Sequence, residues 1–249
     1  MSGTPDVDGE LPFLAHLIEL RERLLKAVSA VGVLFLAGIP FANRIYALLA
    51  QPLLDKMPAG TKMIAIEVAS PFLTPLKLTF FAALVIAMPF VLYQAWAFVA
   101  PGLYRHEKRL AVPLLVSAVA LFYTGCAFAY FLVLPAVFGF LQAVAPAGVA
   151  VMTDISQYLD FVLVLFLAFG LCFEVPVAVV ILVLLGWVTP AQLREARSYV
   201  IVGAFIIAAV LTPPDVVSQL LLAIPMCILY EIGILASRWL PARAETAKT

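Results

Sequence analysis

The stretch SPFLTPLKLTFFAALVIAMPFVLYQAWAFVAPGLYRHEKR, residues 70–109, decides how the rest of the chain is arranged. It opens with a Ser-Pro-Phe turn, continues through an apolar run that contains Pro89, and ends in a charged cluster over 105–109. A helix rises about 1.5 Å per residue, so the run from 78 to 100 can cross a hydrocarbon core of roughly 30 Å. The charged cluster must then lie in water on one side of a membrane.

The composition of the whole chain indicates a polytopic membrane protein. Of the 249 residues, 65% are hydrophobic and 12% are charged, whereas soluble domains carry about 25% charged residues. The net charge of zero gives no overall field that would attract nucleic acid, so nucleic acid is not an expected partner. The three cysteines lie inside apolar blocks, where packing is their expected role.

Six apolar blocks predict an all-α fold with six transmembrane helices. They cover 24–42, 76–100, 111–134, 158–185, 199–211 and 218–236, within one domain over 1–249 that ends in a tail over 237–249. Helices are expected because lipid offers no other partner to backbone polar groups. An even number of spans places both termini on one side, which also holds most of the Lys and Arg residues. The positive-inside rule therefore predicts that both termini are cytoplasmic.

The segment over 11–23 is predicted to form an amphipathic helix. Its apolar residues recur at helical spacing, and its charged residues mark one polar face. We expect this helix to lie along the membrane surface before the chain turns inward at 24. Glu19 and Arg23, like Glu22 and Lys26, are four residues apart with the acid first. Each pair can form a surface ion pair worth about 0.2–0.5 kcal/mol.

Prolines and one acidic turn residue have expected structural roles. Pro52 lies in a proline-rich outer loop, where short interfacial helices joined by rigid turns would form a cap. Pro89 and Pro176 lie inside apolar blocks and are expected to kink their helices, because proline cannot donate the helical hydrogen bond. Asp215 lies in the turn before the last block and is a candidate N-cap.

Glu174 is a carboxylate placed well within an apolar block. At that depth a carboxyl group is costly unless it is protonated, hydrogen-bonded or in a water-filled concavity, so Glu174 is a candidate functional residue. If Glu174 has only a structural role, we expect it to be protonated and hydrogen-bonded to a neighbouring helix. A proton-coupled secondary transporter that uses Glu174 is the alternative function, although the two halves of the chain do not repeat each other as many transporters do.

The last two blocks are predicted to be short. Residues 199–211 span only about 20 Å as a helix, and the apolar run from 218 to Glu231 is no longer. The turn between them, with Thr212 and Gln219 at its edges, is expected near the outer membrane face. A short hairpin of this kind distorts the bilayer and favours contact with partner helices or with membrane lipid.

The sequence lacks the motifs that would indicate an enzyme. It contains no phosphate-binding loop, no H-E-x-x-H and no G-x-S-x-G, and its only histidines are His16 and His106. No cofactor or metal site is therefore predicted. We interpret the chain as a binding and scaffolding membrane protein, with self-association as an open alternative.

Five segments together resemble the TatC family, a subunit of the twin-arginine protein translocase. They are HLIELRERL at 16–24, ASPFLTPLKLTF at 69–80, YQAWAFVAPGLYRHEKR at 93–109, FEVPV at 173–177 and LTPPDVVSQLLLAIP at 211–225. The resemblance implies six helices in a bacterial inner membrane, with cytoplasmic termini and a concave, capped cup.

The resemblance also implies a function. The chain would bind twin-arginine signal peptides of folded proteins and, with the single-span partners TatA and TatB, support export driven by the proton-motive force. The implied signal-peptide site comprises Glu19, Glu107, Arg21, Phe98 and Leu103; Glu174 is implied in the concavity, and Thr212 and Gln219 at the partner-helix site. A carboxylate can pair bidentately with a guanidinium, and lysine cannot reproduce that planar fork. Two acids on one surface would therefore suit two arginines.

Overall fold

Helices account for nearly all of the part of the chain that this computed structural model describes, residues 10–54, 64–99, 111–144, 154–211 and 216–238. Extended structure in these ranges is limited to an isolated bridge between Ile64 and Asp154. The predicted all-α class is confirmed. The helices are α1 (Glu10–Gly38), α2 (Ala42–Leu54), α3 (Ser70–Val99), α4 (Ala111–Phe128), α5 (Leu134–Val144), α6 (Ile155–Cys172), α7 (Val175–Leu184), α8 (Pro190–Glu195), α9 (Arg197–Leu211) and α10 (Val216–Arg238).

Five helical stretches of the described chain are long and apolar enough to cross a membrane. They are His16–Leu48, Ser70–Val99, Ala111–Phe140, Ile155–Leu184 and Gln219–Arg238. The remaining predicted span corresponds to α9, whose 15 residues reach only about 22 Å. The prediction that this helix is short is therefore confirmed, whereas six complete spans stay a prediction.

The prediction that the last helix is also short is wrong. α10 has 23 residues and continues past Glu231 to Arg238. Glu231 does not end the helix because Glu is a good helix former. It also pairs with Arg197: the Arg197 Nε lies 2.6 Å from Glu231 Oε1, and Nη2 donates to Oε2 at 2.7 Å. The bidentate pair joins the start of α9 to α10.

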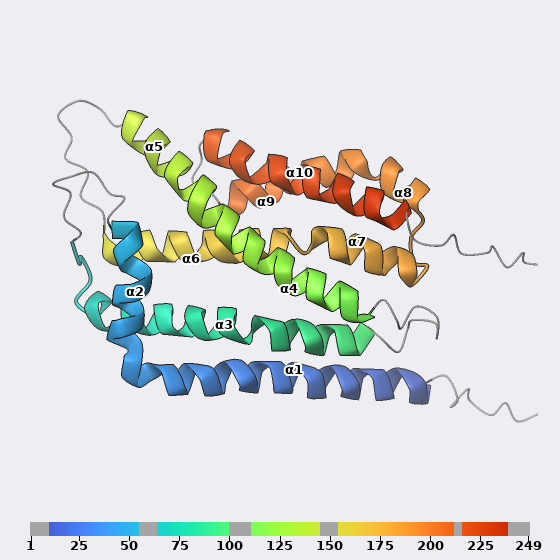
Figure 1. Cartoon of the computed structure of the whole chain (residues 1–249), viewed down its shortest axis with the longest axis horizontal. Coiled ribbons are helices and arrows are strands. Elements are labelled where there is room, and N and C mark those ends of the chain that lie inside the picture. Colours follow the sequence, from blue (N-terminus) through green and yellow to red (C-terminus); the bar gives the residue numbers. More distant parts are fainter. Residues whose placement is uncertain (1–9, 55–63, 100–110, 145–153, 212–215, 239–249) are drawn as a thin grey trace, which may run out of the picture.

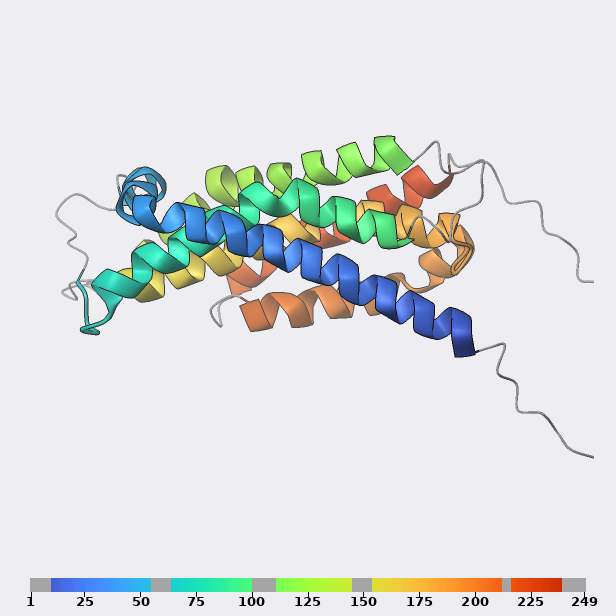
Figure 2. The ribbon, with the colours of Figure 1, turned by 90° about the horizontal axis from the view of Figure 1, so that it is seen from below.

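α1, α3 and α6 run roughly parallel to the long axis of the bundle, whereas α4 and α5 cross it obliquely (Figure 1). α1 and α3 run side by side, α10 packs against α7 and α9, and α2 starts at the end of α1 and crosses α3 (Figures 1 and 2). α1 begins and α10 ends at the same end of the bundle, on the right in Figure 1, which we call the termini end. Which end faces the cytoplasm stays a prediction.

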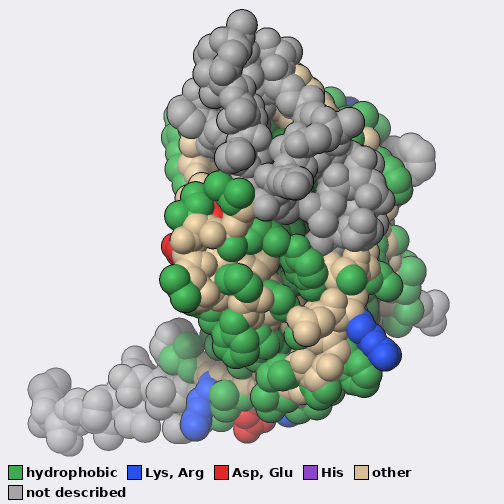
Figure 3. All heavy atoms as spheres, turned by 90° about the vertical axis from the view of Figure 1, so that its left-hand side faces the viewer, with side chains coloured by type: hydrophobic (Ala, Val, Ile, Leu, Met, Phe, Trp, Pro, Cys, Tyr) green, Lys and Arg blue, Asp and Glu red, His purple; other side chains and the backbone are tan. Residues whose placement is uncertain are grey.

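The outer surface of the helices is largely apolar. Leu24, Phe131 and Val210 are among many large hydrophobic side chains that the protein itself leaves exposed. Figure 3 shows the end opposite the termini, where the described side chains are mostly hydrophobic and charged ones are scattered. Such a surface is unfavourable in water and stable against lipid. The protein core is formed elsewhere, mainly by Phe122, Phe169, Leu165 and Leu222, all nearly inaccessible.

The sequence predicts that the chain turns inward at residue 24, and this prediction is wrong. α1 is one continuous helix from Glu10 to Gly38. Pro12 lies in its first turn, where proline is tolerated, and the Leu, Glu, Arg and Lys residues that follow favour helix. The predicted surface helix over 11–23 and the first predicted span are therefore parts of the same element.

The third predicted span continues beyond residue 134, where its end is predicted. Residues Ala129–Val133 form a π-helical turn, in which the backbone N–H of Leu134 donates to the carbonyl oxygen of Ala129. Helix then resumes as α5, with Pro135 in its first turn. The wider turn removes the need for a donor at Pro135, and the helix continues to Val144.

The prolines with predicted structural roles differ in their local effect. Pro52 lies within α2, the helix that crosses α3. Pro89 lies inside α3 without ending it. Pro176 opens α7, directly after the helix is interrupted at Phe173 and Glu174. The size of any kink at Pro89 stays a prediction, and Asp215 lies outside the described residues.

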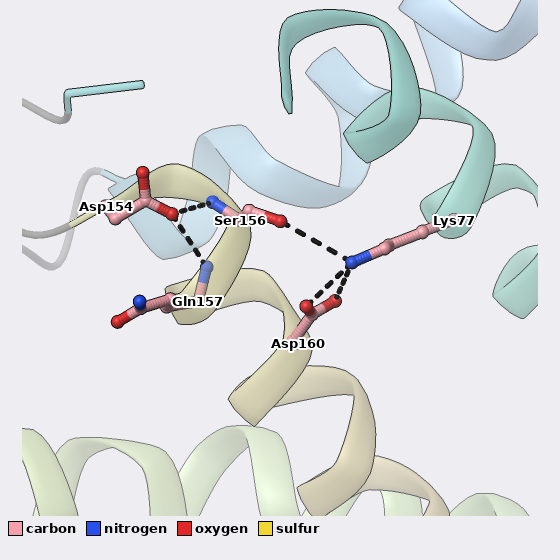
Figure 4. A network of polar contacts seen from close by, with 5 residues as sticks. All are labelled: Lys77, Asp154, Ser156, Gln157 and Asp160. Atoms are coloured by element: carbon pink, nitrogen blue, oxygen red, sulfur yellow. Dashed lines mark hydrogen bonds and ion pairs between the residues drawn. The ribbon is translucent and has the colours of Figure 1, made fainter. Parts of the chain in front are cut away.

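Asp154 joins the loop before α3 to the first turn of α6. Its Oδ1 accepts hydrogen bonds from the backbone N–H groups of Ser156 at 2.9 Å and Gln157 at 3.0 Å, and its Oδ2 accepts one from Ile66 at 2.9 Å. One turn further along α6, Lys77 of α3 donates to Asp160 at 2.7 and 2.9 Å and to Ser156 Oγ at 3.5 Å (Figure 4). These contacts fix α3 against α6 at the end opposite the termini.

We expect Asp154→Asn to lower stability and to remove an acid-dependent step. The N–H of Ile66, followed by those of Gln157 and Ser156, lowers the pKa of Asp154 below its ordinary value of 3.8. The carboxylate thus stabilises the fold fully above that value, and this contribution is lost as the pH falls through the lower pKa of the folded state. The Asn oxygen can still accept the hydrogen bonds at the start of α6. Its N–H₂ group, however, would face the N–H of Ile66, and two donors cannot bond to each other.

The measurement is the thermal unfolding midpoint of wild type and Asp154→Asn between about pH 2 and pH 6, the range in which a carboxyl group titrates. The difference between the two proteins should shrink as the pH falls. A difference that stays constant over that range would show that the carboxylate charge at this cap does not contribute.

Candidate functional site

The first turns of α1 meet the last turn of α3 at the termini end. The imidazole of His16 stacks on the ring of Phe98, with ring centroids 4.2 Å apart and an angle of 18° between the planes. His16 remains half exposed, and Phe98 is partly buried. The stack therefore places a flat aromatic surface at the edge of the bundle, beside the charged residues of α1.

Glu19 lies directly beside this stack. Both Nε and Nη2 of Arg23 donate to its Oε1, at 3.0 and 2.6 Å, while His16 Nδ1 lies 3.8 Å from its Oε2. The predicted pair between Glu19 and Arg23 is thus confirmed. The second predicted pair, Glu22 with Lys26, is absent from the ion pairs within the described ranges.

The structure brings together part of the predicted signal-peptide site. Glu19 and Phe98 are neighbours through His16, whereas Arg21 is exposed on another part of the surface of α1. Glu107 and Leu103 lie outside the described residues. His16 is not among the residues that the sequence pattern predicts. Its spacing of three from Glu19 could have indicated a contact, but nothing local indicates its stacking on Phe98.

Glu174 lies where the fourth predicted span is interrupted, between α6 and α7. Its backbone N–H donates to Leu171 at 3.0 Å, and its side chain makes no capping hydrogen bond. Its Oε1 is buried and has no hydrogen-bond partner within the described part of the chain. The Oε1 atom of this predicted intramembrane polar residue is therefore shielded and without a described donor, while the residue as a whole is partly exposed. It makes no described contact with the Glu19 cluster.

Gln219 ties α10 to α9. Its Nε2 donates to the backbone carbonyl oxygen of Phe205 at 3.1 Å. This bond occupies one side of the amide and fixes the geometry of the α9–α10 hairpin at its turn. The other residue of the predicted partner-helix site, Thr212, lies outside the described residues.

The described residues do not form a metal site. No group of three or more His, Cys, Asp or Glu side chains within these ranges is placed to hold a metal ion. The Glu19 cluster combines instead one carboxylate, two cationic or aromatic neighbours on α1, and the ring of Phe98 on α3. Such a cluster can bind a cation that is both planar and a hydrogen-bond donor.

Comparison with known proteins assigns the family. The family model described as Sec-independent protein translocase protein (TatC) matches residues 15–225. The chain belongs to the TatC family. The resemblance seen in the sequence is thereby confirmed, and it extends over most of the chain.

Two TatC proteins illustrate how similar the relatives are. The Sec-independent protein translocase protein TatC of Azotobacter chroococcum is 57% identical over 247 residues, which cover 99% of this chain and 97% of that protein. The TatC protein of Escherichia coli strain K12 is 57% identical over 233 residues, covering 94% and 90%.

A solved TatC structure supports the fold. A crystal structure of the twin arginine translocase receptor TatC matches with a TM-score of 0.79 at 38% identity, over 90% of this chain and 98% of that chain. Membership in the TatC family makes the chain a multi-pass membrane component of a protein translocase that works with other Tat components. No catalytic activity is indicated by this family.

Proposed function

We propose that the chain is the receptor subunit of a twin-arginine translocase and that its signal-peptide site lies at the termini end, on the cytoplasmic side. The observation that carries the proposal is the position of Glu19, whose carboxylate lies beside the stacked rings of His16 and Phe98. A guanidinium can pair with the carboxylate and stack on the rings. Glu107, together with Leu103 and Arg21, would complete the site and receive the second arginine.

In this proposal the Glu19 carboxylate is already paired with a basic neighbour before the signal peptide binds. Arg23 already holds Glu19 at 2.6 Å, so an incoming arginine must share the carboxylate with it. A carboxylate has about four lone-pair sites, which is enough for two guanidinium groups. The basic neighbours would then fix the direction of the acid, while the signal peptide supplies the second donor group.

Crosslinking tests the location. Single cysteines at 14–24 and 98–109, in a variant that lacks the native cysteines, would be combined with a photoreactive twin-arginine peptide. We expect crosslinks to concentrate around 16, 19 and 98 and over 103–107. Crosslinks confined to the opposite end of the bundle, or external accessibility of a cysteine at 107, would contradict the site and the orientation.

We further propose that the α9–α10 hairpin receives the single-span helices of TatA and TatB. The short α9 carries exposed Ile201, Val202 and Ile206, and Gln219 fixes its geometry relative to α10. A membrane-spanning partner could cover this apolar face and the polar turn with Thr212. The proton-motive force would drive the export that these partners carry out.

The surroundings of Glu174 suit a second candidate function, which an experiment can distinguish from the receptor function. A buried carboxyl oxygen without a described partner is also what a proton-coupled secondary transporter would use. In the proposed receptor, Glu174 instead provides a polar point in the concavity for the signal peptide. Solute uptake by the purified protein alone in liposomes, lost in Glu174→Gln, would favour the transporter. Absence of uptake together with normal signal-peptide binding would favour the receptor.

A further inference from the structure

The imidazole of His16 leaves one ring face and the ring edge accessible to a ligand, because Phe98 covers only the other face. One face of the imidazole is covered by the Phe98 ring, at 4.2 Å between centroids, while the side chain as a whole stays 51% exposed. The exposed area therefore belongs to the other face and to the ring edge. Phe98 packs against the covered face of the imidazole and thereby limits the rotation of the His16 ring.

The two oxygens of Glu19 are in different surroundings. Arg23 directs both of its donating nitrogens to Oε1. Oε2 instead lies on the side of His16, 3.8 Å from Nδ1, which is too long for a hydrogen bond. The carboxylate is thus held by Arg23 through one oxygen, and its second oxygen lies beside the imidazole, near Nδ1.

This geometry suits a planar cation. A guanidinium that stacks on an aromatic ring lies within about 6 Å of the ring centroid. Because Oε2 is only 3.8 Å from an atom of that ring, the same guanidinium would also be within reach of Oε2. An ammonium group could approach Oε2, but it has no flat surface to place on the imidazole.

We propose that His16, supported by Phe98, is a binding residue that selects arginine over lysine in the ligand of Glu19. This inference rests on the proposed function, since it takes the ligand to be the twin-arginine peptide. Arg23 acts as a positioning residue, which turns Oε2 toward the ring. His16 supplies the surface on which the peptide guanidinium stacks.

The test measures peptide affinity in detergent-solubilised protein by fluorescence anisotropy. The probes are a twin-arginine peptide and the two peptides in which lysine replaces one arginine. The variants are His16→Ala, which removes the ring, His16→Phe, which keeps a ring, and Glu19→Gln. Glu22→Gln is the matched control, because it makes the same change of charge three residues away at an exposed side chain without a described ion pair.

We expect His16→Ala to weaken binding of the twin-arginine peptide by roughly two- to fivefold, the range of an exposed stacking contact. It should leave one of the two lysine peptides unaffected, namely the one that lacks the arginine paired with Glu19. His16→Phe should retain most of the affinity and of the preference for arginine. Glu22→Gln should behave as wild type.

Other outcomes overturn the inference. Equal loss for all three peptides in His16→Ala would mean that His16 only supports the packing of α1 on α3, and His16→Phe behaving like His16→Ala would exclude stacking. Failure of the proposed function has a different signature. In that case Glu19→Gln would bind the twin-arginine peptide as well as wild type does, whatever the His16 variants show.

Discussion

Glu19→Gln is expected to lower the affinity for a twin-arginine peptide by roughly tenfold to a hundredfold. The estimate follows from hydrogen bonds to charged groups, which contribute about 1.5–3 kcal/mol each when a partner is removed. Gln keeps the size of the side chain and one acceptor oxygen, but it offers no charge to a guanidinium. The loss should therefore appear in the affinity and not in the amount of inserted protein.

The fold should tolerate this change. Glu19 and Arg23 are one-third and one-quarter exposed, so Arg23 can be hydrated when its partner loses its charge. Partly exposed pairs of this kind stabilise a helix by only about 0.3–0.5 kcal/mol. A thermal unfolding midpoint close to that of wild type is the control for Glu19→Gln. The same substitution at Glu107 is expected to weaken binding comparably, and unchanged affinity in both variants would refute the site.

Gly125→Ala is expected to destabilise the protein by about 1–3 kcal/mol, the usual range for overpacking in a well-packed core. A Cβ at Gly125 would lie 2.5 Å from the carbonyl oxygen of Phe169 and 2.9 Å from its carbonyl carbon. These are backbone atoms of α6, so the clash cannot be relieved by rotating a side chain. α4 and α6 would have to move apart, and the larger Gly125→Leu should prevent correct folding.

Gly32→Ala is the matched control for this prediction. Gly32 also lies inside a helix, and a Cβ there would have no heavy atom within 4 Å. Replacing it should be neutral or stabilising by up to about 1 kcal/mol, since Ala favours helix over Gly. For a chain of this size, 1 kcal/mol corresponds to a shift of about 2–4 °C in the unfolding midpoint. Equal midpoints for the two alanine variants would contradict a close approach at Gly125.

The close approach at Gly125 also explains how the interrupted span is supported. The same Cβ would meet Phe173 at 3.0 Å, and on α10 a Cβ at Gly233 would meet Pro176 at 3.0 Å. A glycine on α4 and a glycine on α10 thus pack against the residues on either side of Glu174. Close backbone packing of this kind is a common way to associate helices in lipid.

The sequence by itself determined the features that depend on neighbours along one helix. The apolar runs gave the all-α class, because lipid leaves backbone groups no other partner. The spacing of four residues gave the pair of Glu19 and Arg23, which meet on one helix face whatever surrounds them. The short length of α9 follows from a residue count alone.

Only the tertiary structure decided which residues meet from different helices. It placed His16 on Phe98, paired Arg197 of α9 with Glu231 of α10, and bonded the Gln219 side chain to the backbone of Phe205 in α9. The turn expected at 24 and the span end expected at 134 were wrong for a related reason, since hydropathy marks where lipid begins and not where a helix ends. Contacts between helices depend on their packing in space, and the pattern along one chain does not specify that packing.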